Sequence, residues 1–357
     1  MPDRTHDILV VGGTGFIGVP LVRALAGAGH RVTVYHRGVH EPALPAGVEH
    51  VRDSGAAIPV LHYPAALRAQ SFDAVVLVVP LGEADARAAV DAFRGQAARL
   101  VAVSSGDVYA AYAQVTGRDV RPAHVPPPAR LDEDAPVRAA LYPYGRVARS
   151  PWGGALRDCE KLLVERVVLG AAERPGGGPQ GTVLRFPAVY GPGDRRPRFA
   201  GWLTRLDAGR PVLLGARQAG WRWTHAYVDD AAAAVALAAT HPRAAGRIYN
   251  VGEAETPTVA DRVRALGRAA GWDGEVVVVP DDALPPPLRE PLDYAVDLVS
   301  DTRRIRGELG FVERVAPDEA LRHTVAAIRG GGLAAPPDDA VLALENAALD
   351  QARNDQS

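Results

Sequence analysis

The sequence predicts an α/β fold in which a doubly wound parallel sheet carries a smaller C-terminal lobe. Short apolar, β-branched runs alternate with helical patterns through the first half of the chain, and a glycine-rich turn follows the first run. Apolar strands separated by helices indicate a parallel sheet that is covered on both faces. Such sheets bind ligands at the carboxyl ends of their strands, so we expect the functional site there.

The elements of this sheet follow one another along the chain. The predicted strands are 7–11, 31–35, 48–52, 73–79, 99–105 and 182–186, and the predicted helices are 16–28, 83–97 and 158–170. A later run at 246–252 is expected to return to the same sheet. We therefore assign residues 1–193 and about 223–252 to the domain that contains the sheet.

Two stretches interrupt the alternation. Residues 113–154 are rich in Pro, Gly and Arg, and an irregular segment of this length is usually a functional loop or a flap. Residues 194–222 and 253–330 mix helical patterns with a strand at 275–280, and we expect them to form the substrate-binding lobe. The tail, 331–357, is expected to carry one short helix and otherwise to be loosely held.

The composition indicates a soluble, cytoplasmic protein. Of the 357 residues, 47% are hydrophobic, and the formal net charge of −2 argues against nucleic acid or an anionic membrane as partner. A single cysteine, Cys159, excludes an internal disulfide framework. The sequence shows no signal-peptide pattern and no apolar run that would span a bilayer. No His/Cys cluster has ligand spacing, so no metal site is expected.

The stretch VVGGTGFIG places Gly12, Gly15 and Gly18 directly after the first predicted strand and at the start of a helix. Glycines allow a tight turn there and let a pyrophosphate approach the backbone N–H groups at the positive end of the helix. Because a strand precedes the turn and a helix follows it, we predict a dinucleotide site rather than a glycine turn without a ligand. Its residues are Gly12, Thr14, Gly15, Phe16, Ile17 and Gly18.

The end of the second strand bears on which dinucleotide binds. The carboxylate that would accept the ribose 2′-hydroxyl of NAD is missing from VYHRG, where Arg37 follows the strand. An arginine accommodates a 2′-phosphate, so NADP is favoured while NAD stays open; a solvated loop arginine is the alternative. Asp53, after the third strand, either meets the adenine amine or is an ordinary turn aspartate.

Five motifs carry a resemblance to a known family. The chain resembles the extended short-chain dehydrogenase/reductase superfamily, in particular its NAD(P)-dependent epimerase/dehydratase branch, with atypical features. The resemblance covers about residues 7–330 and implies a Rossmann domain, Ser–Tyr–Lys chemistry on carbonyl or hydroxyl groups, often of sugar nucleotides, and a homodimer. The motifs are GGTGFIG (12–18), SSGDVYA (104–110), RFPAVYGPGD (185–194), WTHAYVDDAAAAVALA (223–238) and YNVGE (249–253).

The resemblance implies roles for residues beyond the glycine turn. Ser105 matches the serine that holds the substrate oxygen, and Ser104 and Pro187 lie in motifs that flank the cofactor. Tyr109 is expected to form a wall of the substrate pocket. Arg222 is expected to bind the diphosphate of a nucleotide, with a solvated arginine as the alternative. His225, in the same motif, is expected to be structural.

Lys161 is the only lysine among the 40 lysine and arginine residues, and with Glu165 it matches the KxxxE of the family. In that family the lysine holds the nicotinamide ribose, and an arginine is not equivalent to it in that role. The alternative is that this lysine was retained by chance on an exposed helix face. The family tyrosine four residues earlier is replaced by Arg157, which would share a helical face with Lys161. Arginine stays protonated and is no general base, so the triad is incomplete.

Three residues are candidates to replace the tyrosine. Tyr142 and Tyr144 lie in the flap, where either would fold over the nicotinamide, and Asp107 takes the position of an acidic general base in dehydratase-type relatives. Packing tyrosines and a turn-capping aspartate are the alternatives. We therefore predict an NADP(H)-dependent enzyme of the oxidoreductase, epimerase or dehydratase type that acts on a small hydroxyl- or carbonyl-bearing metabolite, such as a sugar or nucleotide sugar. The alternative is a non-catalytic NADP(H)-binding regulatory or sensor protein.

Overall fold

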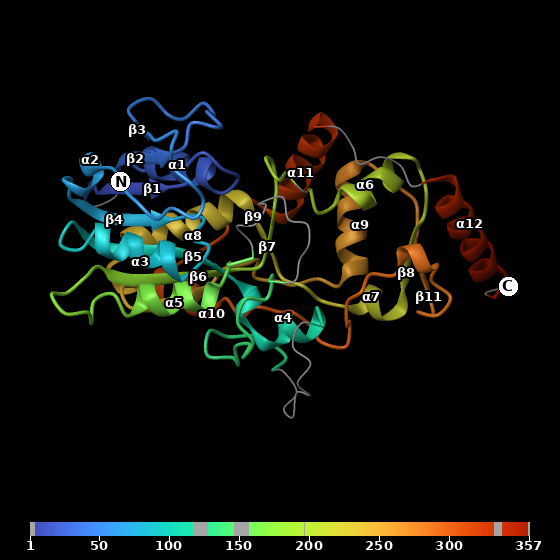
Figure 1. The fold of residues 1–357 in the computed structure, drawn as a ribbon. Helices are drawn as coiled ribbons and strands as arrows, with labels where there is room; N and C mark the ends of the chain where they lie inside the picture. The colour runs from blue at the N-terminus through green and yellow to red at the C-terminus, as the bar shows by residue number, and fades with distance from the viewer. Residues whose placement is uncertain (1–3, 118–127, 146–156, 196, 332–337, 356–357) are drawn as a thin grey trace.

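The structure is a computed structural model that describes residues 4–117, 128–145, 157–195, 197–331 and 338–355. Figure 1 shows two bodies, one built around the large sheet and a smaller one that contains α6, α9 and α12. Parts of the predicted flap lie outside the described residues. No helix in the described ranges is both long and apolar enough to cross a membrane.

A seven-stranded sheet forms the larger body, and every pair of neighbouring strands in it is parallel. The strand order is β10-β6-β5-β4-β1-β2-β3, so the direction of winding reverses between β1 and β4. This confirms the doubly wound parallel sheet and places its ligand crevice at the carboxyl ends of these strands. The strands are β1 (Asp7–Val11), β2 (Arg31–His36), β3 (Glu49–Arg52), β4 (Phe72–Leu77), β5 (Ala97–Ser105), β6 (Gln180–Phe186) and β10 (Arg247–Asn250).

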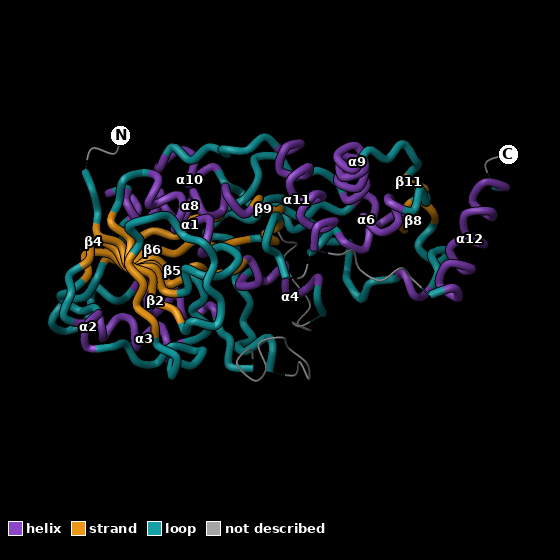
Figure 2. Tube along the Cα trace, turned by 90° about the horizontal axis from the view of Figure 1, so that it is seen from above, coloured by secondary structure: helices purple, strands orange, loops and turns teal. Residues whose placement is uncertain are grey.

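Helices cover both faces of this sheet, as Figure 2 shows for α1 and α8 on one side and α3 on the other. Alternate residues of β1 face the two layers: Ile8 packs with α1 and α8, and Leu9 packs with α3 and α5. The layers are therefore held by continuous apolar strands, as the sequence predicts. The helices are α1 (Gly18–Gly27), α2 (Ala65–Arg68), α3 (Glu83–Ala92), α5 (Lys161–Leu169), α8 (Val228–Thr240) and α10 (Arg303–Leu309).

The smaller body contains a two-stranded parallel sheet of β8 and β11. The C-terminal helix α12 packs on it through Leu349, which lies with Leu213 and Val277, and the buried carboxylate of Glu345 accepts from Arg205 Nε at 2.9 Å. The predicted helix of the tail is thus anchored by packing and by an ion pair. The elements are α6 (Ala200–Asp207), β8 (Val212–Gly215), α7 (Ala216–Gly220), α9 (Val259–Ala270), β11 (Val276–Val279), α11 (Pro317–Gly331) and α12 (Asp339–Asn354).

The junction between the two bodies is formed by short elements at the carboxyl ends of the sheet strands (Figure 1). β7 (Ala188–Tyr190) and β9 (His225–Tyr227) pair in parallel there. The turn η1 (Gly106–Val108) and helix α4 (Ala110–Val115) continue directly from β5. The described part of the flap is docked on this junction, since the backbone N–H of Leu131 donates to the Val299 oxygen at 2.7 Å.

Candidate active site

The glycine turn between β1 and α1 has the geometry that its motif predicts. Gly12 has φ +92°, and a Cβ on Gly18 would lie 2.3 Å from the Gly12 carbonyl oxygen, so only glycine lets α1 start this close to the strand. Gly15 is exposed, and its Cβ would meet nothing nearer than that same oxygen at 3.8 Å. The turn therefore leaves open space at the positive end of α1, which fits the pyrophosphate of a dinucleotide.

The other predicted residues of the turn surround this space. Thr14, Phe16 and Ile17 are half-buried and flank the exposed Gly15. Phe16 approaches the loop after β7, because a Cβ on Gly193 would lie 3.5 Å from its ring. The turn thus meets the segment that leads into the smaller body.

The end of β2 carries no carboxylate, and Arg37 is exposed directly after it. Both carboxylate oxygens of Asp53 accept hydrogen bonds from other residues of the protein. Its Oδ2 accepts from the Tyr35 hydroxyl at 3.0 Å, and its Oδ1 accepts from the Gly55 backbone at 3.1 Å. These bonds fit a turn aspartate, and each carboxylate oxygen keeps a lone pair that is able to meet an adenine amine.

Lys161 is the first residue of α5 and reaches the carboxyl ends of β4 and β5. Its Nζ donates to the carbonyl oxygen of Pro80 and, at 3.2 Å, to that of Val103. An ammonium has three N–H donors, so among the described residues one donor remains beyond these two bonds. The half-buried amine lies at the crevice, as a ribose-binding role requires.

Arg157 does not share a helical face with Lys161. Glu160 is extended and caps α5 by accepting from the Leu162 backbone at 2.9 Å, so the helix begins only at Lys161. Arg157 lies exposed in the preceding turn. The argument from helical spacing, which put it in the place of the tyrosine, therefore does not hold in this structure.

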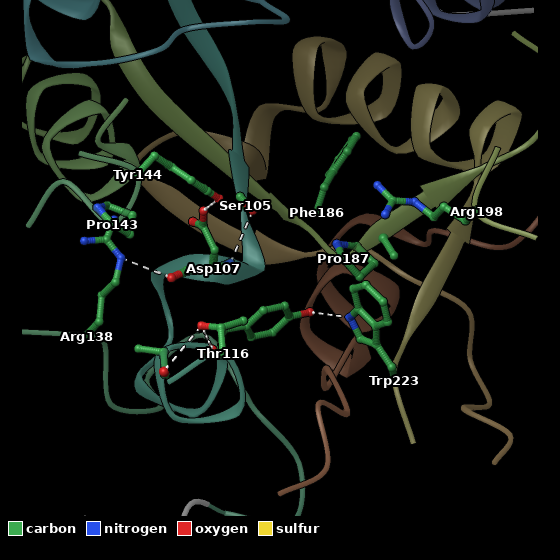
Figure 3. Close-up of a pocket in the computed structure, with 13 residues that line it drawn as sticks. Ser105, Asp107, Thr116, Arg138, Pro143, Tyr144, Phe186, Pro187, Arg198 and Trp223 are labelled. Atoms are coloured by element: carbon green, nitrogen blue, oxygen red, sulfur yellow. Dashed lines mark hydrogen bonds between the residues drawn. The ribbon is translucent and has the colours of Figure 1, made fainter. Parts of the chain in front are cut away.

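A cavity of about 190 Å³ opens beside Ser105, at the carboxyl ends of β5 and β6 (Figure 3). In Figure 3, Tyr144 and Asp107 point toward one another on one side, and Arg198 and Trp223 lie on the opposite side. Polar groups thus face each other across a space with apolar walls, an arrangement typical of a small-molecule site. The lining includes Ser105, Asp107, Tyr112, Thr116, Arg138, Pro143, Tyr144, Phe186, Pro187, Arg198 and Trp223.

Asp107 is the centre of the polar side of the cavity. Its Oδ2 accepts from the Tyr144 hydroxyl, and its backbone N–H donates to Ser105 Oγ at 3.2 Å. Its Oδ1 is buried and has no hydrogen-bond partner in the described part of the chain. Because an unpaired buried carboxylate oxygen is costly, this aspartate is not explained as a turn cap alone.

The two flap tyrosines differ in where their side chains lie. Tyr142 is 46% exposed, has φ 55° and is not among the residues that line the cavity. Its backbone N–H donates to Glu160 Oε2 at 2.6 Å. Tyr144, two residues later, lines the cavity, so the predicted catalytic role of Tyr142 finds no support in its position.

A buried ion pair holds the flap, η1 and α5 together. Arg138 donates to Glu160 through two bonds of 2.9 and 2.6 Å, and the two side chains are 2% and 0% exposed. Arg138 Nε also donates to the backbone oxygen of Asp107 at 3.1 Å. Since Glu160 precedes Lys161, one pair fixes the relative positions of Asp107, the flap and the lysine.

Ser104 and Tyr109 belong to a buried network rather than to the cavity. Ser104 Oγ donates to Glu165 Oε1 at 2.6 Å, and Glu165 also accepts from Arg185 at 3.0 and 2.7 Å. The Tyr109 hydroxyl donates to Asn250 Oδ1 at 2.7 Å. Burial raises the pKa of Tyr109 to about 12. Neither residue is among those that line the cavity, so the expected cofactor contact of Ser104 and pocket wall of Tyr109 remain predictions.

Arg222 does not line the cavity. It is exposed, and its Nη1 donates to the Thr256 backbone oxygen at 2.7 Å. The arginine on the cavity wall opposite Asp107 is Arg198, whose Nε donates to the Val189 oxygen at 2.8 Å (Figure 3). Sequence reasoning missed Arg198 because it follows a Pro/Arg-rich loop without regular spacing.

Trp223 and Tyr112 form the aromatic side of the cavity, and sequence reasoning did not single them out as site residues. Trp223 Nε1 donates to the Tyr112 hydroxyl oxygen at 3.1 Å. His225 Nδ1 donates to the Trp223 backbone oxygen at 2.8 Å, and burial holds the pKa of His225 well below its usual value. This burial and this bond fit the structural role expected for His225. Burial also raises the pKa of Cys159 to about 11, which disfavours the reactive thiolate form.

Comparison with known proteins identifies the family. The sequence model of the NAD dependent epimerase/dehydratase family matches residues 8–76 and 157–252. The chain is 30% identical over 320 residues to 2′-dehydrokanamycin reductase of Streptomyces kanamyceticus, and the match covers 88% of this chain and 80% of the relative.

Solved structures share the fold. UDP-N-acetylglucosamine 4-epimerase from Bacillus cereus has a TM-score of 0.63 at 17% identity, over 91% of this chain and 100% of that one. UDP-glucose 4-epimerase from Thermus thermophilus, solved with NAD, has a TM-score of 0.59 at 24% identity, over 91% and 100% of the two chains. The matched segments include the glycine turn and helix α5, which begins at Lys161. The chain therefore belongs to the NAD-dependent epimerase/dehydratase family.

Proposed function

We propose that this protein is an NADP(H)-dependent reductase that interconverts a ketone and an alcohol on a sugar ring. The observation that carries the proposal is the convergence of Ser105, Asp107 and Tyr144 on one cavity at the carboxyl end of β5, the strand whose Val103 carbonyl oxygen accepts from Lys161. Three groups able to hold or move a proton thus lie at the sheet edge where a dinucleotide would bind. The 30% identity to a reductase of a dehydro-sugar compound supports this class of substrate.

The glycine turn, Lys161 and Ser105 would have separate roles in binding the cofactor and the substrate. The glycine turn would hold the pyrophosphate, and Lys161 would bind the nicotinamide ribose with its remaining donor. When bound, the nicotinamide supplies or accepts a hydride. Ser105 would orient the substrate oxygen by a hydrogen bond, and the apolar walls around Phe186 and Pro187 would keep water from the reacting atoms.

The cavity favours a glycoside over a nucleotide sugar. Arg222, the residue expected to hold a diphosphate, is engaged with Thr256 and does not line the cavity. The cavity arginine, Arg198, and the indole of Trp223 are suited to ring hydroxyls and to the apolar face of a sugar ring. We therefore infer that the substrate is a glycoside that carries no diphosphate.

Consumption of reduced cofactor tests the function. With NADPH and 2′-dehydrokanamycin, absorbance of the reduced nicotinamide is expected to fall in proportion to the protein added, and UDP-glucose with NADP+ is expected to give no signal. Turnover of UDP-glucose instead would reverse the substrate assignment. Tight NADPH binding without turnover of either compound would refute the reductase and support the cofactor-sensor alternative.

The substitution Arg37→Ala tests the preference for NADP. We propose that its exposed guanidinium binds the 2′-phosphate directly after β2, a strand that itself contains no carboxylate. Because a hydrogen bond to a charged group contributes about 1.5–3 kcal/mol, Arg37→Ala is expected to weaken NADPH binding roughly 10- to 100-fold and to leave NADH binding unchanged. Fluorescence titration measures both constants. Equal loss for the two cofactors would contradict the role of Arg37, and Arg68→Ala is a control on the surface helix α2.

A further inference from the structure

The structure offers a pair of side chains for the proton transfer, for which the sequence has no tyrosine four residues before Lys161. We propose that Tyr144 and Asp107 form a proton relay, in which Tyr144 touches the substrate oxygen and Asp107 exchanges a proton with Tyr144. The proposal rests on the proposed function, because it assumes ketone–alcohol chemistry in the cavity.

The two residues come from different elements and meet at the cavity. Asp107 lies in η1, directly after β5, and Tyr144 lies in the flap. The Tyr144 hydroxyl donates to Asp107 Oδ2, and both residues line the cavity with Ser105 (Figure 3). A phenol that donates to a carboxylate retains oxygen lone pairs with which to accept a proton. The observed bond is therefore the arrangement that a relay needs for oxidation of an alcohol.

The chemistry of the relay balances in both directions. In oxidation, the alcohol proton passes to the Tyr144 oxygen while the proton of Tyr144 passes to the Asp107 carboxylate, and the carbon loses a hydride to the oxidised cofactor. In reduction, the carbonyl carbon gains the hydride, the carbonyl oxygen gains the Tyr144 proton, and protonated Asp107 returns its proton to Tyr144. One hydride and one proton thus convert the ketone into the alcohol.

The fold holds both members of the pair in place. Arg138 donates to the backbone oxygen of Asp107 at 3.1 Å and to the oxygen of Ala140 in the flap at 2.6 Å. Glu160 completes the attachment by accepting from the Tyr142 backbone. The buried Arg138–Glu160 pair therefore fixes η1 and the flap relative to one another, which a relay between them requires.

The other phenols near the cavity are less suited to this role. The hydroxyl oxygen of Tyr112 accepts from Trp223 Nε1 at 3.1 Å, and burial raises the pKa of Tyr112 far above its usual value. Tyr109 is buried, and its hydroxyl is bonded to Asn250. Of the three phenols, only Tyr144 combines a place on the cavity wall with a carboxylate partner.

Tyr144→Phe tests the relay, with Tyr142→Phe as a matched control from the same loop. With 2′-dehydrokanamycin and NADPH as probes, Tyr144→Phe is expected to lower kcat by roughly 10²- to 10⁴-fold, the usual contribution of general acid–base catalysis. Its Kd for NADPH and its Tm are expected to stay unchanged. Tyr142→Phe is expected to keep the original kcat, because that side chain is exposed outside the cavity.

Asp107→Asn separates the relay from a structural role. Asparagine keeps the shape and can still accept from Tyr144, but it takes up no proton, so kcat is expected to fall while KM for the ketone and Kd for NADPH are retained. A rise in KM with unchanged kcat would mean that Asp107 only binds substrate and would overturn the relay. Normal kcat in Tyr144→Phe would overturn it while the reductase assignment stands. Absence of turnover by the unmodified protein would refute both.

Discussion

Replacing Glu160 by alanine is expected to destabilise the folded protein by about 3–5 kcal/mol and to abolish turnover. The substitution leaves the Arg138 guanidinium buried without its counter-charge, since the two side chains are 2% and 0% exposed. It also removes the acceptor of the Leu162 and Tyr142 backbone N–H groups. Urea unfolding followed by circular dichroism measures the loss of free energy.

An exposed ion pair provides the control for this experiment. Arg353 and Glu275 lie 3.0 Å apart with side chains 59% and 58% exposed. Because solvent screens such a pair, Glu275→Ala is expected to cost between about 0 and 1 kcal/mol. A cost for Glu160→Ala as small as that of Glu275→Ala would show that water reaches Arg138, contrary to the buried pair described above.

Replacing Glu165 by alanine is the second change for which we expect a large loss, again of about 3–5 kcal/mol. Glu165 is the shared acceptor of Ser104 and Arg185, and the guanidinium and carboxylate of the pair are 4% and 5% exposed. The KxxxE glutamate therefore fastens α5 to β5 and β6 from inside the protein. Chemical denaturation of the variant measures this contribution.

The double variant Glu165→Leu/Arg185→Met distinguishes a lost ion pair from lost packing. Apolar side chains of similar size leave no unpaired charge, so the double variant is expected to be more stable than Glu165→Ala alone. Strictly additive losses for Glu165→Leu and Arg185→Met would contradict coupling between the two charges. A double-mutant cycle provides the coupling energy directly.

The strands and the glycine turn were predictable because local patterns determine them. β1, β2 and β4 are short runs rich in apolar and β-branched residues, and the turn before Gly18 needs glycine whatever surrounds it. The first turn of α5 was not predictable, because its start depends on Glu160, whose partner Arg138 lies 22 residues earlier. Periodicity carries no information about such a pair.

The side chains around the cavity were predictable only in part. Ser105 and Asp107 follow a strand directly, and their positions come from the sheet itself. Tyr142 and Tyr144 are two residues apart in a segment without regular structure, so spacing gives no means to decide which one faces inward. The position of Tyr109 depends on a bond between its hydroxyl and Asn250, 141 residues away, which spacing does not reveal.

The chain passes from the large sheet to the smaller body and back before β10 completes the sheet edge. Neither body is therefore encoded by one uninterrupted stretch of gene, because α6 and β8 are inserted between β6 and β10. A single crossover between two related genes therefore cannot exchange the whole of one body without also exchanging part of the other. Chimaeras made by one such exchange would mix parts of both bodies.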